Sequence, residues 1–200
     1  MLYTQSFHLQ ELERLMQTIP NFAPRGHGII ILREQCGRRV QTGTMTQKEI
    51  LREALANIHS PPFLHRLDQY LQRKEEYTMN YRNERHKVTF AEIVGETNRQ
   101  NYGLLAALYL LTADHKLWMT AKRKISYDDI YFEQMHLPAG TERAYILFST
   151  AKDLYLGTKH LTVRDLADPK LISPELFALI CNAMAIRRFG LGAVKFKNND

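Results

Sequence analysis

Cysteine is scarce in this chain of 200 residues, which contains only Cys36 and Cys181. The two cysteines are far apart, and neither belongs to the CxxC pair that is typical of zinc ligands. Their scarcity argues against a disulfide framework and against a zinc site. Because a chain without disulfides suits a reducing compartment, we expect the protein to be cytoplasmic.

Uninterrupted apolar runs of membrane length are also missing. A helix that spans a bilayer needs about 20 mostly apolar residues, and the apolar stretch at 104–111 is far shorter. The sequence after Met1 has neither the basic region nor the apolar region of a secretory signal. We therefore expect no membrane partner.

The motifs on which catalysis and cofactor binding depend are absent too. The eight histidines include no HExxH pair, and the glycines form neither of the phosphate-binding frames GxGxxG and GxxxxGK[ST]. Asp128, Asp129 and Glu133 are the densest group of carboxylates, but acids in the first turn of a helix also complement its dipole. The sequence therefore predicts no catalytic residue, no metal and no cofactor, and we expect the protein not to be an enzyme.

Apolar residues at helical spacing dominate the second half of the chain. Residues 104–111 are uncharged and mostly large, as in a helix that other helices surround. A second helix is expected over 142–155, where apolar residues recur every three or four positions. Ser173 and Pro174 begin a third helix, and Gly190 ends it. The residues predicted to pack together in one core are Leu105, Leu108, Leu147, Leu154, Ile180 and Met184.

The first half has a more varied pattern. Residues 5–18 have helical spacing, whereas the β-prone run 29–32, followed by Val40, predicts a small two-stranded ribbon. A capping box then opens a helical hairpin over 46–76. The polar segment 77–87 is predicted to be an exposed connection.

These patterns predict a mainly α protein, a compact helical domain with a small N-terminal β-ribbon. The chain is divided at the polar connection. An N-terminal lobe, residues 1–87, holds the first helix, the ribbon and the hairpin. A helical C-terminal block, residues 88–200, holds the apolar helices and a further helix expected over 126–135.

Three stretches of the C-terminal half resemble a known family. They are AALYLLTAD at 106–114, the helix at 143–156, and AMAIRRFG at 183–190. The family consists of uncharacterised small helical proteins of Gram-positive bacteria and their phages, which share this order of helices, a leucine–aspartate turn and a basic and aromatic end. The resemblance implies a helical fold and a mobile-element setting, and it implies no mechanism, because the family has no assigned activity.

The formal net charge is +6, and the isoelectric point is about 9.3. The basic residues occur in clusters, one of them accompanied by tyrosines, and such clusters favour polyanions. We expect the partner to be an acidic protein surface or a nucleoprotein complex, with nucleic acid itself as the alternative. The residues predicted to bind it are Arg38, Arg39, Tyr77, Tyr81, Arg82, Arg85, His86, Lys87, Lys122, Arg123 and Lys124.

Three functional hypotheses follow. The first is a non-enzymatic binding protein of a phage or mobile element, in its concrete form an anti-CRISPR-type inhibitor that occludes a nucleic-acid-guided host defence nuclease. The second is a nucleic-acid-binding regulator that uses the 46–76 helix pair or the 82–87 cluster. The third is a nuclease with an unrecognised site, which has the least support, because Arg82 and His86 are one residue too close for the arginine–histidine spacing of helical ribonuclease domains. A structural virion protein is a further alternative.

Overall fold

The computed structural model describes residues 39–40, 45–73, 81–137 and 142–193. The chain divides into two compact units, Met1–Thr44 and Met45–Asp200. In the second unit the described elements are α3 (Gln47–Leu55), α4 (Pro61–Arg73), α5 (Glu84–Glu96), α6 (Tyr102–Thr112), α7 (His115–Ala121), α8 (Glu142–Leu156), α9 (Val163–Ala167) and α10 (Pro174–Phe189), with short 3-10 turns η1 (Lys122–Lys124), η2 (Phe132–Gln134) and η3 (Gly190–Ala193). The prediction of a mainly helical protein is confirmed.

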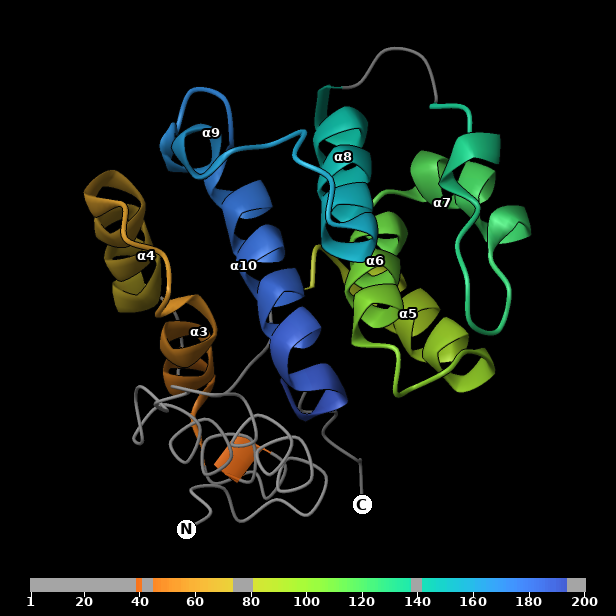
Figure 1. Cartoon of the computed structure of the whole chain (residues 1–200), viewed down its shortest axis with the longest axis horizontal. Coiled ribbons are helices and arrows are strands. Elements are labelled where there is room, and N and C mark those ends of the chain that lie inside the picture. Colours follow the sequence, from red (N-terminus) through yellow and green to blue (C-terminus); the bar gives the residue numbers. More distant parts are fainter. Residues whose placement is uncertain (1–38, 41–44, 74–80, 138–141, 194–200) are drawn as a thin grey trace, which may run out of the picture. The chain divides into compact units, whose positions relative to one another are not determined.

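Helix α6 lies at the centre of this unit. It packs against α5, α7, α8 and α10, and α10 in turn packs against α3 (Figure 1). Every side chain from Leu104 to Leu111 is fully buried. The uniformly apolar sequence of this helix is thus explained by neighbours on all of its sides.

Local capping signals set the helix ends as predicted. The Ser173 hydroxyl accepts a hydrogen bond from the Leu176 amide, and Pro174 occupies the first turn of α10. Gly190 ends that helix with φ of +63°. Thr46 and Glu49 form the expected capping box of α3. Because these signals are contained within a few residues, the sequence alone can reveal them.

The segment Pro174–Ala193 is long and apolar enough, by length and composition, to cross a membrane. Two thirds of its apolar window, 67%, is buried inside the protein. Core helices of folded proteins pass the same test, and α10 packs against α3, α6 and α8. Its apolar character is therefore accounted for by the core.

The predicted core is confirmed at four positions and is less buried at two. Leu105, Leu108, Leu147 and Ile180 are fully buried. Leu154 and Met184 are only partly covered, since both lie towards the surface sides of their helices.

The prediction of a helix over 126–135 is wrong. An isolated antiparallel bridge joins Ile125 to Ile130, and the Ser126 amide donates to the Asp129 carbonyl, so the chain turns back sharply. Serine and aspartate favour tight turns as strongly as helix starts, and here the turn is adopted.

Three further predictions concern the N-terminal part. Residue 87, chosen as the lobe boundary, lies inside α5, whereas the compact units divide between Thr44 and Met45. The expected helix over 5–18 and the ribbon run 29–32 lie outside the described residues. Arg39 and Val40 are described, and both are helical.

Candidate partner-binding surface

Arg82, predicted to face a partner, is held in an internal network. Its guanidinium donates to the Ala113 carbonyl at 3.0 Å and to the Asp114 carboxylate at 3.1 Å. Its Nε also lies 3.5 Å from a carboxylate oxygen of Glu175. Glu175 in turn forms a bidentate salt bridge with Arg143, in which both N–O distances are 3.0 Å. Arg82 thus connects the start of α5 with α7 and α10, and its predicted contact with a partner stays a prediction.

His86 is not on the surface at all, because its side chain is fully buried. Its Nδ1 accepts a hydrogen bond from the Arg82 amide, so the proton resides on Nε2, which donates to the Tyr109 carbonyl at 2.8 Å. Burial, opposed by the hydrogen bond to the Tyr109 carbonyl and aided by the charge of Arg82, lowers the pKa of His86 to about 4. The prediction that His86 binds a partner is therefore wrong, and the residue is a neutral part of the core.

Tyr81 packs edge-on into the same aromatic group. Its ring centroid lies 5.2 Å from that of His86 and 5.9 Å from that of Tyr109. Its hydroxyl is buried and forms no hydrogen bond with the described part of the chain. Burial raises the pKa of this phenol above its ordinary value. The residue anchors the start of α5 to the core.

Five predicted partner-binding residues of the N-terminal half remain. Some of them are exposed, and the others lie outside the described residues. Arg85 is exposed, whereas the exposed Lys87 pairs with Glu84 at 3.4 Å on its own helix. Arg39 is exposed too. Arg38 and Tyr77 lie outside the described residues.

The second cluster, Lys122, Arg123 and Lys124, begins a compact loop over residues 122–131, called here the basic loop. The 3-10 turn η1 carries the three cations, and the Ile125–Ile130 bridge closes the loop behind them. The Tyr131 amide donates to the Lys124 carbonyl at 2.9 Å, which places Tyr131 next to η1. Trp118 is half-buried one turn earlier, in α7.

Two tyrosines that the sequence interpretation did not select lie on this loop. The exposed fraction is 67% for Tyr127 and 46% for Tyr131, and both are among the exposed large hydrophobic residues in the described part of the chain. Exposed aromatic rings have a high free energy in water and are common anchors at interfaces. The isoleucines at 125 and 130 are the sequence signal that could have revealed the exposure of these tyrosines. Their spacing suits two paired positions with a tight turn between them.

The acids on and beside the basic loop have intramolecular partners. Asp128 accepts hydrogen bonds from the Asn98 and Asn101 side chains, at 3.0 and 3.2 Å. Asp129 accepts from the Tyr155 hydroxyl at 2.5 Å, and burial together with this bond raises the pKa of Tyr155 to about 12. These contacts turn both carboxylates towards the α5–α6 connection and α8.

Glu133 follows the loop and accepts a hydrogen bond from Lys152 at 2.8 Å. This bond, followed by the charge of Lys152, lowers the pKa of Glu133 below its usual value.

The cations of the basic loop are occupied to different degrees. Lys124 donates to Gln134 at 3.3 Å. Lys122 and Arg123 are exposed and form no ion pair or side-chain hydrogen bond with any residue that the structure describes. The basic loop therefore presents two uncommitted cations beside two exposed tyrosines.

Among the described residues, no group of three histidine, cysteine, aspartate or glutamate side chains is arranged to hold a metal ion. Asp129 and Glu133, which a helix would have brought to one face, are instead bound to Tyr155 and Lys152. Cys181 is buried in α10.

Comparison of the chain with protein-family models, with curated proteins and with solved structures found no match in any of the three.

Proposed function

We propose that this chain is a non-enzymatic binding protein, and that the basic loop is the surface with which it contacts a polyanionic partner. The observation that carries the proposal is the contrast within the loop. Its acids are bound to neighbouring elements, whereas Lys122 and Arg123 remain uncommitted beside Tyr127 and Tyr131. Arginine and lysine gain most when they meet phosphates or carboxylates, and tyrosine supplies contact area at low entropic cost.

The concrete form of this function is inhibition of a nucleic-acid-guided host defence nuclease by occlusion. An inhibitor that works by occlusion requires a rigid body and a surface complementary to the nuclease, and no chemistry of its own. The buried helices α6 and α10 supply a packed core, and α8, which packs against both, holds the loop through the Tyr155–Asp129 hydrogen bond. The mobile-element setting rests on the resemblance of residues 106–114, 143–156 and 183–190.

The test uses a purified RNA-guided nuclease, with and without its guide, and measures both binding of the full chain and DNA cleavage. We expect the double variant Lys122→Glu, Arg123→Glu to weaken binding at least tenfold, about 1.4 kcal/mol, and to relieve inhibition. Tyr127→Ser with Tyr131→Ser should weaken binding similarly. The matched control is Arg52→Glu with Arg164→Glu, because both arginines are exposed and lie on α3 and α9, away from the loop. Equal binding by the loop variants and the control would contradict the proposal.

A nucleic-acid-binding regulator is the second candidate, favoured by the tyrosines of the loop. Exposed rings beside cations are suited to stack unpaired bases while the cations contact phosphates. A regulator should hold free RNA or DNA, with log K falling linearly against log salt concentration. An inhibitor should bind the nuclease and show little affinity for free nucleic acid. The same protein preparation can be titrated with both, so the two functions are separable.

A further inference from the structure

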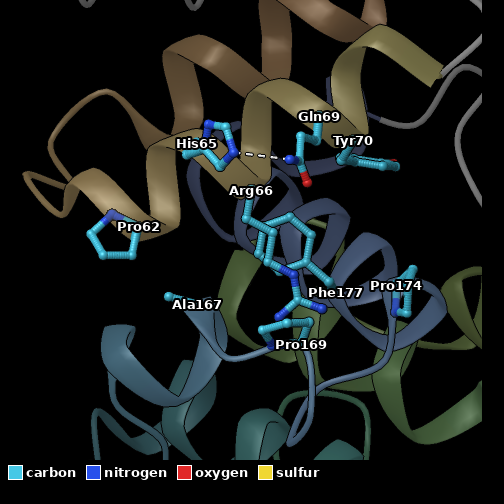
Figure 2. Close-up of a pocket in the computed structure, with 9 residues that line it drawn as sticks. All are labelled: Pro62, His65, Arg66, Gln69, Tyr70, Ala167, Pro169, Pro174 and Phe177. Carbon is cyan, nitrogen blue, oxygen red and sulfur yellow. Dashed lines mark hydrogen bonds between the residues drawn. The ribbon is translucent and has the colours of Figure 1, made fainter.

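A pocket of about 440 Å³ lies between α4 on one side and the end of α9, its connection to α10 and the first turns of α10 on the other. Ligand sites of proteins commonly have volumes of this order, roughly 300–1,000 Å³. Its walls are mainly apolar, and they include Pro62, Pro169 and Pro174 together with the aromatic residues Tyr70 and Phe177 (Figure 2). The basic loop contributes no residue to it.

Arg66 is the charged residue among those that line the pocket. Figure 2 shows its side chain extending from α4 towards Phe177, and the guanidinium carbon lies 4.5 Å from the centre of that ring. Its NH1 donates to the Leu166 carbonyl at 2.7 Å, and its NH2 donates to the Ile172 carbonyl. These bonds fix the guanidinium in one orientation, so a ligand would meet a charge that is already positioned.

The charge of Arg66 has no carboxylate partner. None of the nine lining residues is acidic, and Arg66 forms no ion pair with any described residue. Cys181 and then Asp168 favour the charged form of the guanidinium, but Asp168 forms no ion pair with Arg66, and neither residue lines the pocket. Burial lowers the pKa of the guanidinium, which reflects the incomplete hydration of the cation.

A second polar group stands at the edge of the pocket. Gln69 and His65, one turn apart on α4, are hydrogen-bonded at 2.9 Å (Figure 2). Both side chains can donate a hydrogen bond, and neither is an acid. The site therefore combines apolar walls, a fixed cation and uncharged or basic polar groups.

We propose that this pocket binds a small carboxylate with an apolar, planar body. The carboxylate would be held by the free donor edge of Arg66, whose two main-chain bonds leave further N–H groups available. The apolar body would lie against the prolines and Tyr70. A neutral or cationic ligand of the same shape loses the interaction with the partly desolvated arginine, and this difference provides the specificity.

The test uses three probes of one shape with the full chain: 2-naphthoate, the neutral 2-naphthamide and the cationic 2-naphthylmethylamine. Titration calorimetry should give saturable binding of the carboxylate with a Kd of about 1 mM or tighter. Binding of the amide should be at least tenfold weaker, and the amine should not bind. No saturable binding, or equal binding of acid and amide, would overturn the proposal.

Two variants locate the binding. Ala167→Phe fills the pocket from the end of α9 and keeps Arg66 in the chain, and it should abolish binding of the carboxylate. Its control is Ala91→Phe on the exposed side of α5, which should leave binding unchanged. Arg66→Met keeps the apolar stem and should bring the affinities for acid and amide together. If this variant does not fold, Ala167→Phe and the comparison of probes decide the matter, and carboxylate binding that survives Ala167→Phe would sink the proposal.

Discussion

At the scale of single residues, His86 shows how a buried histidine makes stability depend on pH. The unfolded chain takes up a proton near pH 6.5, and the folded chain only near pH 4, because burial disfavours the charged ring. Between these values the unfolded state binds more protons, so stability is complete above pH 6.5 and falls as the pH is lowered towards 4. The loss should reach about 3 kcal/mol.

Chemical unfolding of the wild type and of His86→Gln across this range measures the effect. The variant should be less stable at neutral pH and should lose less stability on acidification. His136→Gln, at an exposed position, is the control and should retain the wild-type slope. Identical slopes for wild type and His86→Gln would mean that other groups carry the pH dependence.

Arg82 and Arg85 lie three residues apart and should respond differently to charge reversal. Arg82→Glu places a carboxylate against Asp114 and Glu175 and leaves the Ala113 carbonyl without its donor, so it should cost about 1–3 kcal/mol. Arg85→Glu changes an exposed side chain and should stay within about 0.5 kcal/mol. Thermal melts of both variants compare them directly, and equal melting temperatures would contradict the network.

Gly190 is required by the backbone itself. Its φ of +63° and ψ of −149° lie where essentially only glycine is found, and an added Cβ would stand 2.5 Å from the Tyr102 ring. Gly190→Ala should therefore destabilise the fold by about 1–3 kcal/mol. Gly157→Ala, also at positive φ but with open space around it, should cost less in a parallel melt.

At the scale of elements, the basic loop depends on α8 for its position. Phe132 packs against Phe148, and Tyr155 donates to Asp129. Removing the Tyr155 hydroxyl with Tyr155→Phe should cost about 1 kcal/mol locally and should speed hydrogen exchange at residues 126–131. Exchange in α6 should be unaffected, because that helix is held by apolar packing. Unchanged exchange in the loop would show that the aromatic contacts alone position it.

The sequence predicted elements whose signals are local and missed features that depend on distant partners. The caps at Thr46 and Ser173 act within three residues, so pattern alone locates them. The burial of His86 depends on Tyr109, 23 positions away, and nothing near residue 86 indicates it. The composition of residues 126–129 fits the start of a helix as well as a turn. The chain adopts the turn, in which Ile125 pairs with Ile130.

At the scale of the whole unit, a buried polar cluster joins three helices. Asn182 on α10 accepts from Gln47 on α3 at 3.3 Å, donates to the Ala178 carbonyl, and is hydrogen-bonded to the fully buried Tyr109 of α6. Polar groups in a core stabilise it only while all of them are paired. The cluster therefore fixes how α3, α6 and α10 are aligned, which apolar packing alone specifies less strictly.

This arrangement predicts a marked asymmetry between single and combined substitutions. Asn182→Leu should lower the free energy of unfolding by about 2–4 kcal/mol, because it leaves the buried amide of Gln47 and the hydroxyl of Tyr109 without a hydrogen-bond partner. Adding Gln47→Leu and Tyr109→Phe removes these two unpaired polar groups and should restore much of the lost free energy of unfolding. The register of the helices is then less strictly defined. Urea unfolding of the single and triple variants measures the difference. A triple variant less stable than Asn182→Leu would show that volume and shape at this position, and not the pairing of polar groups, govern the core.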